Sequence, residues 1–454
     1  MKKHTNILLG TVSFLSIGYL LMANYYSTHF FPNTKILGFD VSGKKTEEAD
    51  SFIKTELNSE YSLSVKERNN FGEVINGTDI DYQVEINTEP ILKGQEPIKW
   101  IMNMSNDKSY ELEYAHSFNQ DKLMEQVESL SAMQPENMIN PEKAYISEYM
   151  PGIGFQIIEE KAGTQIVKGK ACEAISEAVT QAKKEVNLDE NGCYIEPDET
   201  KESESLNEML DRLNKVASSS ISYKIGDSTK VLNSDIFYQW IITDESGNVS
   251  LNQDMVKEYV TTLAKETDTA YTKRKFKTTS GSTVNVEGPY GYRVDKEAEF
   301  EQLMNEILSG TQAEREPVYS MTGASREGSD YGNTYVEIDL TNQIVYLYVN
   351  GQLIQSSKCV TGNVAKRHTT PPGIYPLTYK QKDAVLRGPG YASPVKFWMP
   401  FNGGIGLHDA SWRSSFGGNI YKTNGSHGCV NLPYDMAKTL YENVYKGMPI
   451  ICYN

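Results

Sequence analysis

Three short segments of this 454-residue chain recur in the same order within its first two thirds. The matched pairs are residues 78–84 with 234–240, residues 118–124 with 251–257, and residues 151–157 with 288–294. A single chance match would not bring two further matches in the same order. The pattern predicts two related modules, at about 33–200 and 201–328, so the chain is expected to contain several domains.

Both modules combine helix and strand signals. Asn119 opens a run whose apolar residues recur at helical spacing, and Asn252 opens a matching run in the second copy. A second helix is expected at 171–186 in one copy and at 297–308 in the other, each after a short strand that contains glycine and an aromatic residue. We therefore expect an α+β fold for each module.

The hydrophobic period changes to strict alternation in the last part of the chain. Residues 335–340 alternate between apolar and polar, as half-buried strands do, and Asn350-Gly351 is a pair typical of a tight β-hairpin. One helix is expected at 434–446. The last domain, 329–454, is therefore predicted to be mainly β.

The N-terminus has a charged start followed by an apolar run. Lys2 and Lys3 precede an uncharged, mostly apolar stretch at 7–23, and aromatic residues follow it. This length is at the short end for a spanning helix, and the lysines keep the N-terminus inside. We predict a cytoplasmic tail at 1–6 and a transmembrane helix at 7–23, which makes the chain a single-pass protein of the cell membrane with its other domains outside. A cleaved signal peptide is the alternative, although Leu21 is a poor residue for its −3 position.

The net charge of −16 is unevenly distributed. Eleven Lys and Arg against seven Asp and Glu give residues 330–454 a balance of +4, so the rest of the chain carries −20. A chain of this overall sign is not expected to bind nucleic acid, which requires clustered basic residues. The basic C-terminal part suits an anionic substrate, such as a peptide that carries carboxylates.

Cysteine usage narrows the chemistry further. The five cysteines include no Cys-x-x-Cys pair, so neither a zinc ribbon nor a redox dithiol is indicated. Pairing of Cys172 with Cys193 is a minor alternative to two buried thiols. Cys429 stands apart from the other cysteines because it lies in the run Ser426-His427-Gly428-Cys429-Val430-Asn431.

This run holds the parts for nucleophilic catalysis by a thiol. Cys429 needs a base within about 3 Å of its sulfur, and spacing alone does not decide between His408 and His427. Gly428 lets a substrate carbonyl approach the backbone, where the N–H groups of Gly428 and Cys429 are expected to stabilise an oxyanion. The alternatives are a buried structural thiol and a zinc site of His408, His427 and Cys429, which lacks a fourth ligand.

The motif and its surroundings resemble the catalytic domain of the L,D-transpeptidase family over about 330–454. The segments that carry the resemblance are Leu407–Arg413, which contains His408, the run Ser426–Asn431, and the turn Thr370–Tyr375. The resemblance implies that Cys429 is the nucleophile and that His408 is the base, with the other ring nitrogen of His408 held by a neighbouring backbone carbonyl.

The same resemblance implies supporting roles for other residues. Ser426, His427 and Gly428 match positions that support the site, and Asn431 and Trp412 match positions that line the substrate cleft. Asp409 departs from the family pattern, because many relatives carry glycine after the upstream histidine. This departure leaves the local loop shape open.

The reaction that the resemblance implies is acyl transfer between peptidoglycan stem peptides, without a cofactor. The third residue of a donor tetrapeptide forms a thioester with Cys429, D-Ala leaves, and a second stem resolves the thioester into a 3→3 cross-link. Carbapenems are expected to acylate the same cysteine. The repeats resemble domains of Gram-positive, cell-wall-associated members that are thought to bind peptidoglycan, although a spacer role is slightly favoured. The alternatives are an L,D-carboxypeptidase and a wall-binding scaffold.

Overall fold

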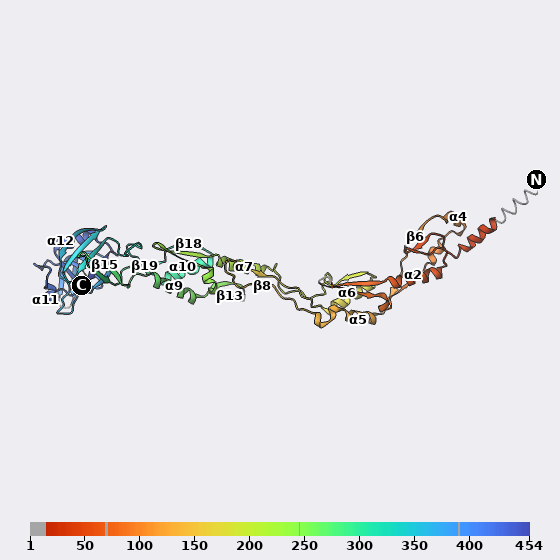
Figure 1. Cartoon of the computed structure of the whole chain (residues 1–454), viewed down its shortest axis with the longest axis horizontal. Helices are drawn as coiled ribbons and strands as arrows, with labels where there is room; N and C mark the ends of the chain where they lie inside the picture. The colour runs from red at the N-terminus through yellow and green to blue at the C-terminus, as the bar shows by residue number, and fades with distance from the viewer. Residues whose placement is uncertain (1–14, 69–70, 245, 389–390) are drawn as a thin grey trace, which may run out of the picture. The chain divides into compact units, whose positions relative to one another are not determined.

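The computed structural model describes residues 15–454 except residues 69–70, 245 and 389–390 (Figure 1). Contacts divide the described residues into two compact units. One unit holds the residues up to Tyr145 together with Ile157–Ser203, and the other holds Ile146–Gln156 together with Glu204–Asn454. The segment Ile146–Gln156 therefore packs with residues that follow it much later in the sequence, which the repeat pattern did not predict.

The structure corrects the prediction of a transmembrane helix at 7–23 and of a single-pass membrane protein. Residues 1–14, which include the predicted tail at 1–6 and the start of the predicted span, lie outside the described residues. Residues 15–25 form a helix. Within the described ranges, no helix is long and apolar enough to cross a membrane.

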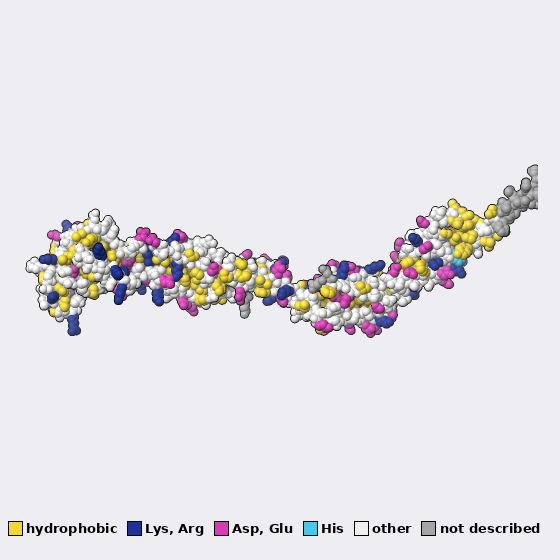
Figure 2. Space-filling view, viewed as in Figure 1, with side chains coloured by type: hydrophobic (Ala, Val, Ile, Leu, Met, Phe, Trp, Pro, Cys, Tyr) yellow, Lys and Arg dark blue, Asp and Glu magenta, His cyan; other side chains and the backbone are white. Residues whose placement is uncertain are grey.

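The aromatic residues after this helix belong to a protein core. Phe30 and Phe31 are fully buried, and the backbone N–H of Phe31 donates to Gln95 Oε1 at 3.0 Å. The ring of Tyr26 stacks on that of Trp100 at 6.0 Å between centroids. Apolar side chains are exposed on the first helix and on α4 (Trp100–Asn103) (Figure 2). Composition did not distinguish this region from a membrane anchor, because both are rich in apolar and aromatic residues.

The first unit is built from small sheets with helices packed on them. One three-stranded sheet has the strand order β2-β1-β6, a second has the order β10-β3-β4, and β5 and β7 form a two-stranded sheet. The apolar sides of α5 and α6 contribute Leu123, Val127, Ala171 and Ile175 to the core of the second sheet. The bounds are β1 Thr34–Ile36, β2 Phe39–Asp40, α2 Thr46–Glu60, β3 Ser62–Lys66, β4 Gly72–Asn76, β5 Gln83–Glu85, α3 Glu89–Lys93, β6 Lys108–Tyr110, β7 Ala115–Ser117, α5 Gln120–Ser129, β8 Tyr145–Ile146, β9 Ile157–Ile158, α6 Lys168–Thr180 and β10 Glu185–Asn187.

The second unit begins with the second module, whose sheet has the strand order β12-β11-β18. Its core gathers apolar residues of α9, α10 and the sheet. The bounds are α7 Glu204–Ala217, β11 Ser220–Ile225, β12 Ser228–Asn233, α8 Ser234–Phe237, η6 Tyr238–Trp240, β13 Ile241–Thr243, β14 Val249–Leu251, α9 Gln253–Thr267, β15 Arg274–Lys277, β16 Thr283–Val286, β17 Arg293–Val294, α10 Lys296–Ser309, β18 Gln312–Arg315 and β19 Tyr319–Met321.

The helix starts predicted from the repeat are confirmed. The side chains of Asn119 and Asn252 accept backbone N–H groups from the first turns of α5 and α9, as N-caps do. The predicted helix at 171–186 ends six residues too late and begins three residues too late, because α6 covers Lys168–Thr180. Ala182 then adopts a left-handed φ of 51°, and Val186 pairs with β3 as part of β10.

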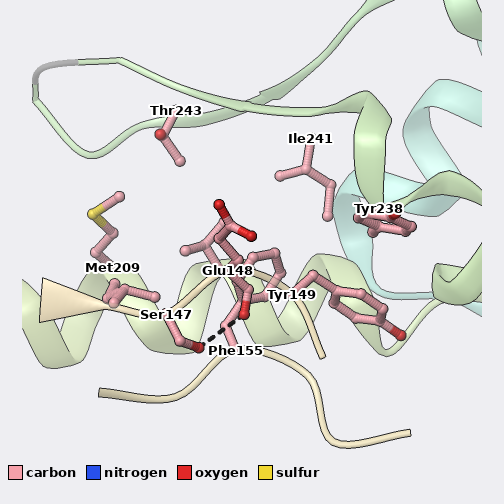
Figure 3. Close-up of a pocket in the computed structure, with 10 residues that line it drawn as sticks. Ser147, Glu148, Tyr149, Phe155, Met209, Tyr238, Ile241 and Thr243 are labelled. Carbon is pink, nitrogen blue, oxygen red and sulfur yellow. Dashed lines mark hydrogen bonds between the residues drawn. The ribbon is translucent and has the colours of Figure 1, made fainter. Parts of the chain in front are cut away.

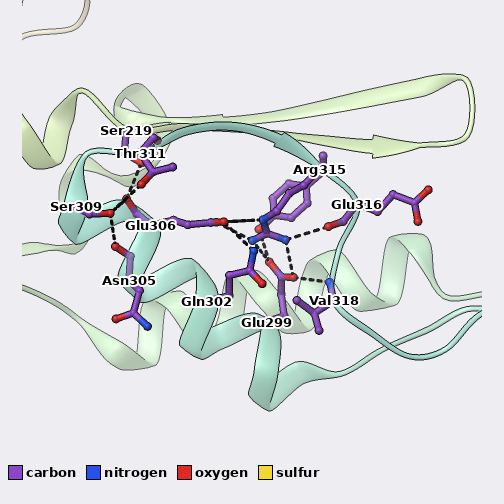
Figure 4. A network of polar contacts seen from close by, with 11 residues as sticks. Ser219, Glu299, Gln302, Asn305, Glu306, Ser309, Thr311, Arg315, Glu316 and Val318 are labelled. Atoms are coloured by element: carbon purple, nitrogen blue, oxygen red, sulfur yellow. Dashed lines mark hydrogen bonds and ion pairs between the residues drawn. The ribbon is translucent and has the colours of Figure 1, made fainter.

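A buried ion network joins α10 to β18 (Figure 4). Arg315 Nη2 lies 2.8 Å from both Glu299 Oε1 and Glu306 Oε2. Glu299 is fully buried, and it also accepts hydrogen bonds from the Tyr223 hydroxyl at 2.6 Å and from the Val318 N–H at 2.7 Å. Each charge has several partners, which is the condition under which a buried ion pair is tolerated.

The C-terminal domain contains two sheets that enclose one core. One has the strand order β22-β21-β20-β28-β23, and the other has the order β24-β25-β26-β27. The predicted hairpin at Asn350-Gly351 is confirmed, since both residues have positive φ, 50° and 77°, as a type I′ turn requires. The bounds are β20 Tyr335–Asp339, β21 Ile344–Val349, β22 Gln352–Lys358, β23 Gly373–Pro376, β24 Gln381–Gly388, β25 Tyr391–Asn402, β26 Ile405–Asp409, α11 Ile420–Asn424, β27 Val430–Leu432, α12 Tyr434–Asn443 and β28 Pro449–Tyr453.

The hairpin β15–β16 of the second module packs on this domain. Phe276 on β15 contacts Tyr453 at 5.9 Å between ring centroids. The buried carboxylate of Glu337 accepts hydrogen bonds from the Thr279 N–H at 2.9 Å and from the Tyr453 hydroxyl at 2.5 Å. The second module and the mainly β domain therefore share a core within one unit.

Candidate active site around Cys429

Two adjacent parallel strands, β26 and β27, position the predicted nucleophile and base. In the pair β26–β27, Leu407 is opposite Val430 and His408 is opposite Asn431. Cys429 directly precedes β27, two residues before Asn431, the register partner of His408. Cys429 and His408 both line a cavity of about 210 Å³. Of the seven predicted site residues, six line this cavity, namely His408, Trp412, Ser426, His427, Cys429 and Asn431.

His408 is held in one orientation by its own strand. It is buried, and its Nδ1–H donates to the backbone carbonyl of Asp409 at 2.8 Å. A proton on Nδ1 leaves Nε2 as the lone-pair nitrogen. Burial lowers the pKa of the His408 imidazole, and the hydrogen bond to Asp409 opposes this shift. The ring at rest is therefore a neutral base.

Asp409, where many relatives carry glycine, has a structural role. Its Oδ1 accepts hydrogen bonds from the backbone N–H groups of Lys396 at 2.8 Å and Phe397 at 2.9 Å. These two donors belong to β25, the neighbour of β26. The carboxylate thus fastens β25 to the strand that carries His408, which settles the loop shape that the sequence left open.

The Cys429 thiol is partly buried beside the backbone of β26. Its Sγ lies 3.6 Å from the carbonyl oxygen of Gly404. Burial raises the pKa of the Cys429 thiol, and a hydrogen bond from the Gly406 backbone N–H acts in the opposite direction. The sulfur at rest is therefore a thiol that needs a base for attack.

Ser426 closes the loop around Cys429. Its Oγ accepts a hydrogen bond from the Gly428 N–H at 3.0 Å and donates to the Cys429 carbonyl at 2.5 Å. The Gly428 N–H is therefore engaged inside the loop, whereas from the sequence we expected it to face an oxyanion. Gly428 has a φ of 120°, and a Cβ there would lie 3.1 Å from the Ile405 side chain. The position therefore favours glycine for both backbone and space.

Two residues upstream contribute to the site without having been predicted. The buried hydroxyl of Thr370 donates to the Gly428 carbonyl at 2.6 Å and accepts from the Gly362 N–H at 3.0 Å. The ring of His368 lies against the exposed ring of His427 at 4.7 Å between centroids. Thr370 opens the turn at 370–375, so this motif was visible in the sequence. The hydrogen-bond partner of Thr370, Gly428, lies 58 residues away, so the contact itself was not.

The cavity wall offers polar and aromatic groups to a ligand. Asn431 is buried and exchanges two backbone hydrogen bonds with Val360, at 2.9 and 3.0 Å. Its side-chain Oδ1 is buried and has no hydrogen-bond partner. Trp412 lies 5.9 Å from the His408 ring and is half exposed. Arg413, which sequence reasoning did not single out as a site residue, also lines the cavity and donates to the Asn424 carbonyl at 2.9 Å.

Neither a Cys172–Cys193 disulfide nor a zinc site is found among the described residues. All five cysteines are free thiols, including Cys172 and Cys193. Among the described residues, no group of three or more His, Cys, Asp or Glu side chains gathers in a way that could hold a metal ion.

A mainly β domain in which a cysteine thiol and a buried imidazole line one cavity suits a cysteine acyltransferase. Residues 333–452 match the family model of the L,D-transpeptidase catalytic domain (YkuD), and residues 202–315 match that of a peptidoglycan binding domain. The chain belongs to the L,D-transpeptidase family, and it is a cysteine transpeptidase. A comparison with curated proteins finds no match.

Solved structures of L,D-transpeptidases are similar to this chain. The carbamoyl enzyme of Ldtfm with avibactam is 33% identical, over 55% of this chain and 99% of that one, with a TM-score of 0.46. A cysteine-to-serine mutant of the Enterococcus faecium L,D-transpeptidase is 32% identical, over 55% of this chain and 100% of that one, with a TM-score of 0.45. The E. faecium catalytic domain acylated by ertapenem is 38% identical, over 27% of this chain and 98% of that one, with a TM-score of 0.25.

Proposed function

We propose that this L,D-transpeptidase forms 3→3 cross-links in peptidoglycan through a thioester on Cys429. The observation that carries the proposal is the register of β26 and β27, which brings His408 and Cys429 to one cavity. The family supports the reaction class. The +4 balance of residues 330–454 suits stem peptides that carry carboxylates.

In the first half of the reaction, the Nε2 atom of His408 accepts the proton of the Cys429 thiol as the sulfur attacks. The target is the carbonyl carbon of the third residue in a donor tetrapeptide. The carbon–nitrogen bond to the terminal D-Ala then breaks, and the protonated imidazole gives its proton to the leaving amine. Free D-Ala and a thioester on Cys429 result.

In the second half, the side-chain amine of the third residue of another stem attacks the thioester. His408, neutral again, accepts a proton from this amine, and the sulfur leaves and is reprotonated. The new amide bond joins the two third residues, which is the 3→3 link. The thiol and the neutral imidazole are both restored.

The tetrahedral intermediates place negative charge on the former carbonyl oxygen, next to the nucleophile loop. We assign its stabilisation to the backbone N–H of Cys429, because Ser426 Oγ already accepts the Gly428 N–H. Ser426 and Thr370 act by fixing this loop. The unpaired Oδ1 of Asn431 is suited to a substrate amide N–H, and the half-exposed ring of Trp412 to the apolar part of the stem.

A carbapenem presents a strained lactam carbonyl to the same thiol, so we propose acylation at Cys429. An adduct of this kind is known for a relative, since the E. faecium catalytic domain has been seen acylated by ertapenem.

The reaction is tested with a purified muropeptide that carries a tetrapeptide stem, incubated with the full-length enzyme and with a Cys429→Ala variant. The expected products of the wild type, by mass, are free D-Ala and a cross-linked dimer, and neither should form with the variant. If the wild type releases D-Ala but yields only the trimmed tripeptide, the enzyme is an L,D-carboxypeptidase and the proposal fails.

A further inference from the structure

A second, larger cavity lies within the second unit and shares no residue with the cavity around Cys429. Its volume is about 500 Å³, within the ~300–1,000 Å³ usual for small-ligand sites. One wall comes from the segment Ile146–Gln156, one from α7, and one from η6 and β13 (Figure 3). The lining residues of α7, η6 and β13 fall inside residues 202–315, the part that matches a peptidoglycan binding domain.

The wall formed by Ile146–Gln156 is firmly built. Ser147 and Gln156 close it as a hairpin, with an N–H to carbonyl bond of 2.7 Å and a bond from the Gln156 N–H to Ser147 Oγ of 3.0 Å. The Asn214 amide on α7 accepts from the Phe155 N–H and donates to the Phe155 carbonyl, both at 3.0 Å. A Cβ on Gly154 would lie 2.8 Å from Asn214 Oδ1, and its φ is +94°, so this close approach requires glycine.

Aromatic rings form one side of the cavity. Tyr149 and Tyr238 stack at 5.0 Å with an angle of 16° between the rings, and Phe155 meets Tyr149 edge-on at 5.5 Å. The Tyr149 hydroxyl is 2.7 Å from Asp235 Oδ1 and 2.8 Å from Ser234 Oγ, which fixes the ring. Half-buried rings present a flat apolar surface to a ligand and a polar edge to water, a combination suited to the C–H-rich face of a sugar.

The charge of the cavity indicates which component of peptidoglycan it suits, the glycan strand or the stem peptides. Among the described residues that line it, Glu148 is the one that carries a charge, and Asp235 lies behind Tyr149. Since none of these described lining residues is a Lys or Arg, the cavity disfavours the carboxylates of a stem peptide. Met209, Leu213 and Ile241 supply apolar contacts for acetamide methyl groups, and Glu148 and Thr243 supply hydrogen-bonding groups for sugar hydroxyls.

We propose that this cavity binds the glycan strand of peptidoglycan, a chain of N-acetylated sugars, and thereby holds the enzyme on its substrate polymer. The proposal rests on the proposed function for the identity of the polymer, but it concerns a site that takes no part in the chemistry at Cys429. It also changes the role expected for the second module, from a spacer to a glycan-binding domain.

The test is titration calorimetry of the full-length protein with tetra-N-acetylchitotetraose as a soluble glycan probe. Thr243→Trp adds bulk at the exposed rim of the cavity and should weaken binding at least tenfold. Ile242→Trp is the matched control, because Ile242 is the adjacent exposed residue of β13 and its side chain points to the opposite face. This control should bind like the wild type. Tyr238→Ala, which removes half of the ring stack, should also lose affinity.

A second arm uses peptidoglycan freed of stem peptides by an amidase, and a free stem tetrapeptide as competitor. Retention on the stripped glycan that is lost in Thr243→Trp supports the proposal. No binding by the wild type, equal binding by Thr243→Trp and Ile242→Trp, or displacement by the tetrapeptide would overturn it. The rate of carbapenem acylation at Cys429, measured on the same variants, should stay unchanged, so failure of glycan binding is distinct from failure of the transpeptidase chemistry.

Discussion

His408 and Asn431 are register partners in the parallel pair β26–β27. Cys429 stands two residues before Asn431, and Cys429 and the buried imidazole of His408 line one cavity. The ring is oriented by the Asp409 carbonyl at 2.8 Å, and the nucleophile loop is fixed separately by Ser426. The two halves of the proposed catalytic pair are thus held by different backbone elements, and each can be tested alone.

Removal of the base should slow acylation far more than removal of other imidazoles. We expect His408→Ala to reduce the acylation rate by a carbapenem about 10²–10⁴-fold, the usual contribution of a general base. His116→Ala, in the first unit, should react like the wild type, and His427→Ala, whose ring is exposed, should lose much less than His408→Ala. Stopped-flow fluorescence gives these rates. Equal rates for His408→Ala and His116→Ala would remove His408 from the mechanism.

The pH dependence should be that of a neutral pair. Burial lowers the pKa of His408 from its ordinary 6.5 and raises the pKa of the Cys429 thiol from its ordinary 9.0. Acylation should therefore persist as the pH falls through 6.5 and decline only below it, where His408 takes up a proton. The thiolate absorbance of wild type minus Cys429→Ala should be absent at neutral pH and emerge in the alkaline range. A thiolate signal at neutral pH would reveal an ion pair instead.

Thr370 should matter for both stability and activity. Thr370→Val keeps the shape of the side chain but leaves the Gly428 carbonyl and the Gly362 N–H without their partner. We expect a loss of about 1–3 kcal/mol in the free energy of unfolding, together with slower acylation. Thr369→Val, at the exposed neighbouring position, should change neither. Denaturant unfolding and acylation rates measure the two effects, and parallel behaviour of the two variants would refute the role of Thr370.

The ion network of the second module should be required for its stability. Arg315→Met leaves Glu299 fully buried without its cation, which should cost about 3–5 kcal/mol. Arg212→Met removes an exposed pair with Glu208, 3.8 Å long, and a charge near the exposed Asp244, and should cost ~0–1 kcal/mol. Urea unfolding of both variants provides the comparison. Similar midpoints for the two would mean that the network adds nothing.

Local features of the fold followed from the sequence because their causes are local. Asn119 and Asn252 cap their helices with their own side chains, and Asn350-Gly351 needs only its own positive φ values to turn the chain. The motif around Cys429 was also sufficient to predict the family, since Ser426, Gly428 and Cys429 lie within four consecutive residues.

The remaining features depend on partners that are distant in the sequence. Thr370 meets Gly428 across 58 residues, and Phe155 is clamped by Asn214 across 59, so neither role has a local signal. The predicted transmembrane helix at 7–23 was wrong because no helix among the described residues is long and apolar enough to cross a membrane. The aromatic residues that follow it had been a further reason to expect a membrane. Phe30 and Phe31 are apolar whether they meet lipid or protein, and only the fold reveals that they are buried in a core.

The most direct test of the central claim is the mass of the acyl-enzyme formed with a tetrapeptide donor in the absence of an acceptor. The protein is quenched in acid and digested, and its peptides are weighed. We predict one modified peptide, the one that contains Cys429, heavier by the donor minus D-Ala, and weaker labelling in His408→Ala. A thioester on another cysteine, or undiminished labelling of a Cys429→Ala variant, would contradict the account.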